Sequence, residues 1–454
     1  MSSVLHRTVE ERPPIAISGD RLILRLNDGR EIIDASGGAA VACLGHGNRR
    51  VADAIGKQAA RLAYAHTGFF SSEPAEALAE LLVGSQPGDL THAFFVSSGS
   101  EAMESALKLA RQYHLERGEP QRVHYISRRQ SYHGNSFGSL AASGNLARRT
   151  PYEDVLPKNF SRVSPCFPYH YQLEAETDSA YVARLAKELD EEFERVGPNR
   201  VIAFIAETVV GAVAGCVSAV PGYFTAIRKV CDRHGALLIL DEIMCGMGRT
   251  GTTHAWEREQ VFPDIQTIAK GLGGGYQPIG ALLVSKRVIQ ALSDGTGAFV
   301  HGHTYQAHPV ACVAALEVQR IIREEALLRN VEKMGSYLGE CLRSEFAGHP
   351  FVGDIRGRGL FWALEFVANR DRKQSFAPNL GISERIKQTA LGLGLGIYPT
   401  AGTADGVNGD HLIVAPPYIV NSIEVETIVR RLAESIQIAL SDVSIESSSR
   451  TVEA

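Results

Sequence analysis

A lysine, Lys270, stands directly after the segment Thr-Ile-Ala at 267–269, which we expect to be a strand, and directly before a glycine-rich run at 271–275. Lysine is rarely found within an apolar run without a role. Partial burial lowers the pKa of a lysine and leaves its amine free to attack a carbonyl carbon, as in Schiff-base chemistry. The glycines would let a ligand approach closely. A lysine whose stem runs along a sheet edge while its amine stays in water is the alternative, and the local pattern leaves both open.

An acidic pair, Asp241 and Glu242, follows another apolar segment at residues 236–240. A carboxylate at the end of such a segment is costly to bury unless a cationic group meets it. A protonated pyridine nitrogen is one such group. A helix cap or a structural ion pair is the simpler explanation when the position is taken by itself.

A third apolar segment, residues 93–96, is followed by the sequence Ser-Ser-Gly-Ser-Glu-Ala at 97–102, which opens a helical pattern. A turn of this composition at a helix N-terminus presents free backbone N–H groups and a favourable dipole. Ser98, Gly99 and Ser100 could therefore hold a phosphate. The alternative is an ordinary helix cap in which Glu101 completes a capping box.

Two other motifs point to different chemistry and have less support. Residues 246–251 match the dinucleotide-binding pattern Gly-x-Gly-x-x-Gly, and Asp264 lies downstream at a plausible distance. That pattern must open a helix immediately, whereas residues 252–256 make a poor helix start. His301 and His303 could suggest a metal pair, but no third or fourth ligand stands at a usual spacing. We therefore expect no metal site.

The composition is typical of a soluble globular enzyme. The 454 residues exceed what one hydrophobic core usually holds, so we expect two domains. A formal net charge of -5 gives no electrostatic reason to expect nucleic acid or an anionic membrane as a partner. No apolar stretch approaches the roughly 18 residues that a membrane span needs. The seven cysteines are scattered, and the polar residues 1–14 lack the apolar core of a secretory signal, which together favour the cytoplasm.

Short apolar segments alternate with helical patterns through the middle of the chain. This alternation indicates an α/β fold with a mostly parallel sheet that is covered on both faces. The clearest predicted strands are residues 92–96, 201–205, 236–240, 267–269 and 281–284. A hairpin at 22–35, helices at 181–195 and about 309–325, and a strand at 361–366 are also predicted. The carboxyl ends of parallel strands meet at one edge, where ligands bind.

Taken together, the motifs resemble those of the class III, or omega-type, pyridoxal-phosphate-dependent aminotransferases of fold type I. The match in order and spacing runs from about residue 17 to residue 438. The motifs are Ser98-Gly99-Ser100-Glu101-Ala102, Tyr132-His133-Gly134, Ala206-Glu207, Asp241-Glu242, Gly248-Arg249-Thr250-Gly251, Ala269-Lys270-Gly271, His303-Thr304 and Ala415-Pro416-Pro417. The resemblance implies a large cofactor-binding domain with a mostly parallel mixed sheet at 61–310. It also implies a small α/β domain at 311–454, packed with the N-terminal segment 1–60.

The resemblance further implies pyridoxal 5'-phosphate as the cofactor. Lys270 matches the lysine that holds it as an internal aldimine and moves a proton between two carbons. Asp241 matches the carboxylate that pairs with the pyridine nitrogen and keeps the ring protonated, so that it can accept electrons.

The remaining motif residues match groups that surround the cofactor. Ser98, Gly99 and Ser100 match the phosphate loop. Further matches are Tyr132 stacked on the ring, Ile243 on its other face, Glu207 near the ring hydroxyl, and His133 as a further cofactor-binding residue. Thr304 matches a phosphate ligand from the neighbouring subunit, which implies a homodimer or homotetramer with a shared site.

Two departures concern the substrate. Many related enzymes carry a carboxylate-binding arginine in the loop before the Pro-Pro motif, but residues 398–411 hold no Arg or Lys here, and Asn408 stands near that place. Ala40 stands where some amine-converting members have tryptophan, which implies a roomier pocket. We expect Ala40, Tyr132 and Asn408 to line the substrate pocket.

The sequence thus predicts an aminotransferase that moves an amino group from an amine or omega-amino acid to a 2-oxo acid, plausibly pyruvate, through the Lys270 aldimine and pyridoxamine phosphate. Three alternatives stay open. Another pyridoxal-phosphate reaction, such as a phospholyase or racemase, would use the same lysine and aspartate. A nicotinamide-dependent oxidoreductase would use residues 246–251, and a non-catalytic binding protein is disfavoured because Lys270, Asp241 and Tyr132 are all present together.

Overall fold

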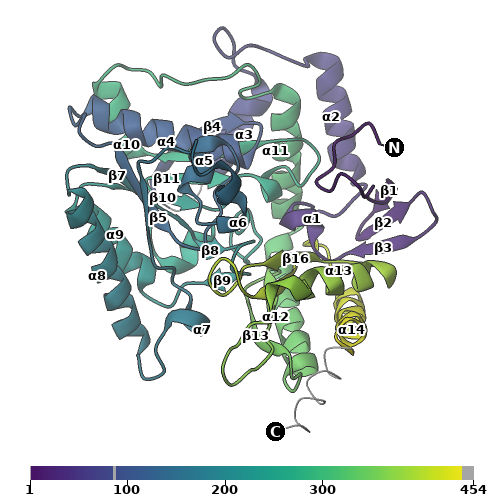
Figure 1. Ribbon diagram of the computed structural model, residues 1–454. Helices are drawn as coiled ribbons and strands as arrows, with labels where there is room; N and C mark the ends of the chain where they lie inside the picture. Colours follow the sequence, from purple (N-terminus) through teal and green to yellow (C-terminus); the bar gives the residue numbers. More distant parts are fainter. Residues whose placement is uncertain (1, 85–87, 442–454) are drawn as a thin grey trace.

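The computed structural model describes residues 2–84 and 88–441, and Figure 1 shows its arrangement. A seven-stranded sheet of order β4-β12-β11-β10-β7-β5-β6 forms its largest layer. The strands are β4 (Leu90–Val96), β5 (His124–Arg128), β6 (Phe160–Val163), β7 (Val201–Glu207), β10 (Leu237–Asp241), β11 (Ile265–Ile268) and β12 (Gly280–Ser285). β12 pairs antiparallel with β11 and β4, and the other pairs are parallel. The predicted α/β fold with a mostly parallel sheet is confirmed.

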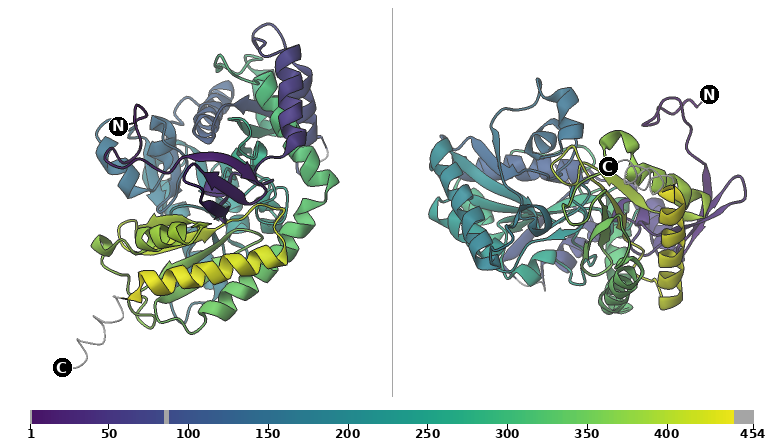
Figure 2. Two further views of the ribbon diagram at one scale, coloured as in Figure 1. Left: turned by 90° about the vertical axis from the view of Figure 1, so that its right-hand side faces the viewer. Right: turned by 60° about the horizontal axis from the view of Figure 1, so that its bottom comes forward.

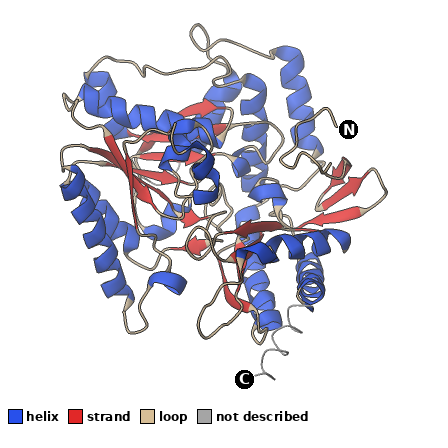
Figure 3. Cartoon of the chain, viewed as in Figure 1, coloured by secondary structure: helices blue, strands red, loops and turns tan. Residues whose placement is uncertain are grey.

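Helices cover both faces of this sheet, and Figure 3 shows the sheet between them. Every residue of β7 is buried, and its side chains alternate between the faces. Ala203 and Ile205 pack in the hydrophobic cluster that contains residues of α4 (Gly99–Glu116) and α10 (Lys286–Asp294). Phe204 and Ala206 pack in the opposite cluster, with α3 (Glu73–Val83), α8 (Asp178–Val196) and α9 (Tyr223–Arg233). Unbroken apolar strands are therefore expected here, because neither face meets water.

A smaller antiparallel sheet of order β13-β14-β17-β16 is formed by the C-terminal part of the chain. Its strands are β13 (Val352–Gly357), β14 (Trp362–Phe366), β16 (Tyr398–Ala401) and β17 (Asp410–Val414). The accompanying helices are α12 (Leu327–Phe346), α13 (Ile382–Gly392) and α14 (Ser422–Ala439).

The N-terminal strands pack with this C-terminal part, and both views in Figure 2 show them side by side. The strands β1 (Ala16–Asp20), β2 (Ile23–Leu26) and β3 (Glu31–Asp34) form a sheet that β15 (Leu395–Gly396) extends by pairing parallel with β3. Leu22 and Val51 share one hydrophobic cluster with Leu432. The proposed division at residues 60 and 310 remains a prediction, and residues 442–454 lie outside the described part of the chain.

Helix α11 (Pro309–Glu324) joins the two halves. Cys312 and Leu316 pack in a cluster under the large sheet, whereas Val318 and Ile321 pack in the cluster of the smaller part. The remaining elements are α1 (Gly37–Ala40), α2 (Arg49–Arg61), α5 (Phe137–Ala142), α6 (Leu146–Arg149), α7 (Pro168–Tyr171), β8 (Val209–Val210), β9 (Val217–Ser218), and the 3-10 turns η1 (Thr150–Tyr152), η2 (Ala255–Glu259), η3 (Lys270–Leu272) and η4 (Pro378–Leu380). Within residues 2–84 and 88–441, no helix is both long and apolar enough to span a bilayer.

Candidate active site

A cavity of about 400 Å³ opens at the carboxyl edge of the large sheet. The parallel strands β7, β10 and β11 end at this edge, so residues distant in sequence meet there. Among the lining residues are nine that the sequence proposed for the cofactor: Ser98, Gly99, Ser100, Tyr132, His133, Glu207, Asp241, Ile243 and Lys270. Thr304 is the tenth proposed cofactor residue, and it lies elsewhere.

Lys270 is the first residue of η3, and only Ala269 separates it from the end of β11. Its backbone φ of 42° is in the left-handed region, which costs a non-glycine residue on the order of 1–3 kcal/mol and is often found at functional sites. Burial lowers the pKa of Lys270 to about 8, although the nearby carboxylates of Asp241 and Glu207 favour the charged form. A substantial fraction of the amine is therefore neutral, and nucleophilic, near physiological pH.

Asp241 is buried at the end of β10, and both of its carboxylate oxygens have partners. Oδ2 lies 2.8 Å from Nδ1 of His133, and Oδ1 accepts the backbone N–H of Ile243 at 3.0 Å. Because a carboxylate only accepts, Nδ1 of His133 is the donor. The other ring nitrogen of His133 is buried without a hydrogen-bond partner among the described residues. The carboxylate is thus held in one orientation at the cavity wall.

Glu207 ends β7 next to Asp241, its register partner on β10, and it binds backbone N–H groups of two neighbouring segments. Its two oxygens accept the N–H groups of Tyr132 at 3.0 Å and Gly211 at 2.9 Å. Burial raises the pKa of Glu207, and the charge of Asp241 raises it further, whereas His133 opposes the shift. The carboxyl of Glu207 therefore holds Tyr132 in its place at the cavity.

The segment at 98–100 forms the N-terminus of α4. Ser98 is the N-cap, and its hydroxyl accepts the N–H of Glu101 at 3.2 Å. The first-turn N–H groups of Gly99 and Ser100 have no carbonyl within the helix to bind, so they remain available to an anion. A Cβ at Gly99 would lie 3.0 Å from two atoms of the Ile243 side chain. A side chain at this position would therefore have to displace Ile243, another residue of the cavity wall.

Two proposed residues lie outside this lining. Ala40 is buried with φ 62° and packs in a cluster with Met244 and Phe361, while its neighbour Val41 lines the cavity. Thr304 is exposed, and its carbonyl accepts the hydroxyl of Tyr64 at 2.8 Å. Neither placement tests the role that the sequence suggested.

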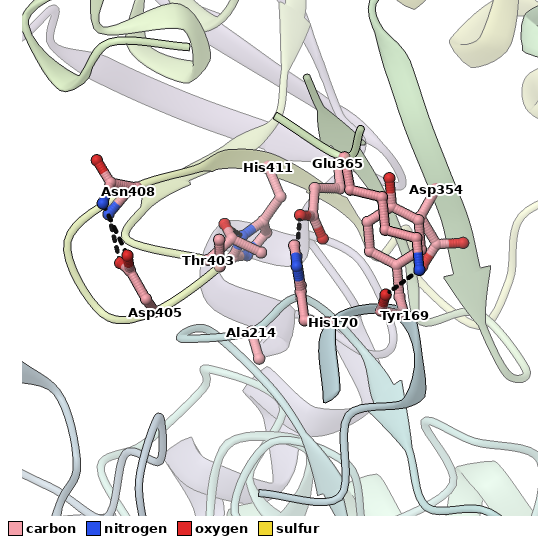
Figure 4. Close-up of polar contacts among 12 residues, drawn as sticks. Tyr169, His170, Ala214, Asp354, Glu365, Thr403, Asp405, Asn408 and His411 are labelled. Atoms are coloured by element: carbon pink, nitrogen blue, oxygen red, sulfur yellow. Dashed lines mark hydrogen bonds and ion pairs between the residues drawn. The ribbon is translucent and has the colours of Figure 1, made fainter. Parts of the chain in front are cut away.

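Asn408 also lies away from the cavity lining. Its amide donates to Asp405 at 2.7 Å, and Figure 4 shows this pair together, apart from Thr403 and His411. The loop is attached to the large-sheet part of the molecule through Gln130, whose amide donates to the Thr403 carbonyl at 2.7 Å. Asn408 therefore stabilises the turn of this loop, and its substrate role stays a prediction.

Several lining residues were not singled out from the sequence. Val41, Met244 and Gln277 line the cavity alongside the proposed residues. Met244 directly follows the proposed Ile243, and Gln277 follows the glycine run after Lys270, but neither residue type is distinctive. In the sequence, only their nearness to a motif indicates that Met244 and Gln277 could line the cavity.

The segment at 246–251 has a structural role. It lies in turns and is followed by η2, so it opens no α-helix as a dinucleotide-binding pattern requires. The buried Arg249 donates to the carbonyls of Leu360 at 3.0 Å and Pro416 at 2.6 Å. This segment joins the large-sheet part to the C-terminal part, which leaves the nicotinamide alternative without a binding element.

The family model for aminotransferase class-III matches residues 10–436. The chain belongs to this family. It is 49% identical to an uncharacterized aminotransferase of Schizosaccharomyces pombe over 433 residues, which cover 95% of this chain and 94% of the relative. It is 36% identical to the diaminobutyrate–2-oxoglutarate transaminase of Halomonas elongata, over 90% of this chain and 87% of the relative. An omega transaminase of Pseudomonas jessenii, in complex with PMP, matches with a TM-score of 0.89 and 33% identity over 95% and 94% of the two chains.

The comparisons confirm a pyridoxal-phosphate-dependent aminotransferase of fold type I. The lining of the cavity fits that cofactor. It places an unpartnered helix N-terminus, a buried carboxylate and a lysine of lowered pKa around one space. Those three features match a phosphate, a ring nitrogen and an aldehyde, respectively.

Proposed function

We propose that this class-III aminotransferase moves an amino group from an amine or omega-amino acid to a 2-oxo acid, with pyruvate as the acceptor. The observation that carries the proposal is the joint placement of Lys270 and Asp241 in one cavity. When bound, the cofactor withdraws electrons from the amine-bearing carbon and carries the amino group between the two half-reactions. The family supports amino transfer, and the identity of the substrates is the proposed part.

Lys270 is proposed as the attachment point and as the group that moves the proton. Its amine would bond to the cofactor aldehyde and, once displaced by the substrate amine, would take the proton from the reacting carbon. The lowered pKa supports this role, because an amine with a pKa of about 8 can both accept and return a proton at physiological pH.

Asp241 would keep the cofactor's ring nitrogen protonated, and the hydrogen bond from His133 would hold its carboxylate in place. Gly99 and Ser100 would bind the phosphate, with Ser98 as the cap beside them. Tyr132 and Ile243 would enclose the ring, both being part of the cavity wall.

The remaining cofactor contacts are proposed from two places. Glu207 would lie near the ring hydroxyl while it holds the backbone of Tyr132. Thr304 would reach the phosphate of the neighbouring subunit's site, in a homodimer or homotetramer. Its exposure on one subunit is what such a role requires.

The proposed preference for pyruvate rests on the charge of the cavity. Lys270 is the only Lys or Arg among the described lining residues. A carboxylate that leaves water without a cation or enough N–H donors is unfavourable. Within this cavity the second carboxylate of 2-oxoglutarate would be another such group, so a monocarboxylate should be preferred. One relative is named a diaminobutyrate–2-oxoglutarate transaminase, so 2-oxoglutarate is the acceptor to compare with pyruvate.

The test is a ¹⁵N-transfer assay with a labelled amine and each 2-oxo acid separately. Label recovered in alanine at a higher specificity constant than in glutamate would support the proposal. A tenfold or greater advantage for 2-oxoglutarate would contradict the acceptor assignment. Release of products without any 2-oxo acid would instead favour a lyase.

A further inference from the structure

A second cavity, of about 1170 Å³, adjoins the first and shares Tyr132 and Ala212 with it. Its lining is rich in charge. The charged residues are Arg7, Glu11, Arg12, Arg30, Arg148, Glu384 and Lys387. Cations outnumber acids here, in contrast to the first cavity, so an anion that enters is attracted to this space.

Some of these cations already have acidic partners. Arg30 pairs with Asp28 at 2.7 Å, and Lys387 pairs with Glu384 at 2.5 Å. Within residues 2–84 and 88–441, no ion pair joins Arg148 to a carboxylate. The guanidinium of Arg148 instead lies 5.2 Å from the centre of the Tyr132 ring. The N–H donors of a guanidinium lie in its own plane. When the guanidinium stacks on an aromatic face, these donors remain free to bind a carboxylate at its edge.

The backbone that carries Arg148 is fixed even though its side chain is exposed. The side chain of Asn145 caps α6 by accepting the N–H of Arg148 at 3.2 Å. The adjacent Arg149 binds both oxygens of Glu153, at 2.9 and 2.8 Å. The backbone at Arg148 is therefore held in place, so that binding of a ligand would have to order only the Arg148 side chain.

Helix α6 also lies against the loop that lacks an arginine. A Cβ at Gly406 would lie 3.1 Å from Cδ1 of Leu146, so the first turn of α6 and this loop are in contact. Arg148 therefore lies on a helix that contacts residues 402–409. This loop contains no Lys or Arg.

We propose that Arg148 is a specificity-determining residue that binds the remote carboxylate of omega-amino acid substrates. This inference rests on the proposed function. Lys270 lines the first cavity and not the second, Arg148 lines the second and not the first, and Tyr132 lines both. A carboxylate at Arg148 is therefore separated from the reacting carbon by the Tyr132 side chain. Longer omega-amino acids span that separation, and short ones such as β-alanine do not.

The experiment compares 5-aminopentanoate with pentylamine as donors to pyruvate, in the wild-type holoenzyme and in Arg148→Gln. A charge-assisted bidentate contact at an exposed arginine predicts a loss of about tenfold in kcat/KM for 5-aminopentanoate. The value for pentylamine, which has no carboxylate, should change by less than about twofold. Arg12→Gln removes an equal charge from the same cavity without touching Tyr132, and it should leave the ratio of the two donors unchanged. Equal losses for both donors, or no loss for either, would overturn the proposal.

Binding of pentanoate separates this inference from the proposed function, because that acid cannot react. Calorimetry with the holoenzyme should show about tenfold weaker binding in Arg148→Gln than in the wild type or in Arg12→Gln. Unchanged binding in Arg148→Gln would overturn the role of Arg148. If the wild type transferred nitrogen from neither donor, the proposed function would fail, and the pentanoate comparison would still decide whether Arg148 binds a carboxylate.

Discussion

At the scale of single residues, the lowered pKa of Lys270 leads to a prediction about pH. The neutral amine attacks the cofactor aldehyde, and with a pKa of about 8 roughly a tenth of Lys270 is neutral at pH 7. Attachment of the cofactor to the cofactor-free protein should therefore speed up as pH rises through about 8 and level off above it. Stopped-flow absorbance can follow this rate. A rate that still rises tenfold between pH 9 and 10 would show an ordinary lysine pKa.

Asp241 gives a second prediction at this scale. Asp241→Asn keeps an oxygen that can accept the N–H of Ile243, so the fold should remain. The loss of the charge beside the ring nitrogen should cost several kcal/mol in the transition state, which corresponds to about a thousandfold in kcat. Circular dichroism and steady-state kinetics check the two halves of this expectation. Near-wild-type turnover would mean that Asp241 only supports His133.

The proposed residues at strand ends line the cavity, as do the proposed loop residues Tyr132 and His133, whereas Ala40 and Asn408 do not. Asp241 follows an unbroken apolar run, Lys270 follows a buried strand that also holds Gln266 and Thr267, and the parallel strands bring such positions to one edge. Ala40 lies one residue away from Val41, the residue that lines the cavity. The left-handed φ of Ala40 sets which of the two side chains turns inward, and residue types in a loop do not reveal that angle.

At the scale of elements, apolar runs predicted the strands because both faces of the large sheet are buried. The antiparallel direction of β12 could not be predicted, since a buried strand has the same composition in either direction. The contact of α6 with the loop at 402–409 was equally hidden, because it depends on tertiary packing between distant segments.

The turn segment at 246–251 gives a stability prediction. Arg249→Met removes the donor that satisfies the carbonyls of Leu360 and Pro416, which then remain buried. We expect the free energy of unfolding to fall by about 2 kcal/mol, measured by urea denaturation. Arg258→Met, which breaks the exposed pair with Glu332, is the control and should cost less than about 1 kcal/mol. If the two variants lost equal stability, the buried contacts of Arg249 would be unimportant.

At the scale of the whole molecule, exposed aromatic side chains lie near Thr304. Tyr64 contacts Tyr305, with ring centroids 6.0 Å apart, and Phe69 and Phe70 are 80% and 68% exposed on the segment that follows Tyr64. Large exposed apolar groups of this kind are typical of an interaction surface. We expect it to be the dimer interface that brings Thr304 to the neighbouring site.

Phe69→Asp combined with Phe70→Asp should therefore yield monomers and weaken cofactor binding at least tenfold. Light scattering after size-exclusion chromatography and titration with the cofactor measure these two effects. Ile423→Asp replaces an equally exposed apolar residue on α14, 73% exposed, and should change neither. A double variant that remained dimeric would place the interface elsewhere.

The attachment of the cofactor to Lys270 is the most direct test of the account. Borohydride reduction of the wild-type holoenzyme, followed by digestion and mass spectrometry, should place the added mass on the peptide that contains Lys270. In Lys270→Ala the cofactor should wash out after reduction, and amino transfer should be lost, because the cavity holds no other lysine among the described residues. A reduced adduct on another lysine, or an Ala variant that still fixes the cofactor covalently, would contradict the account.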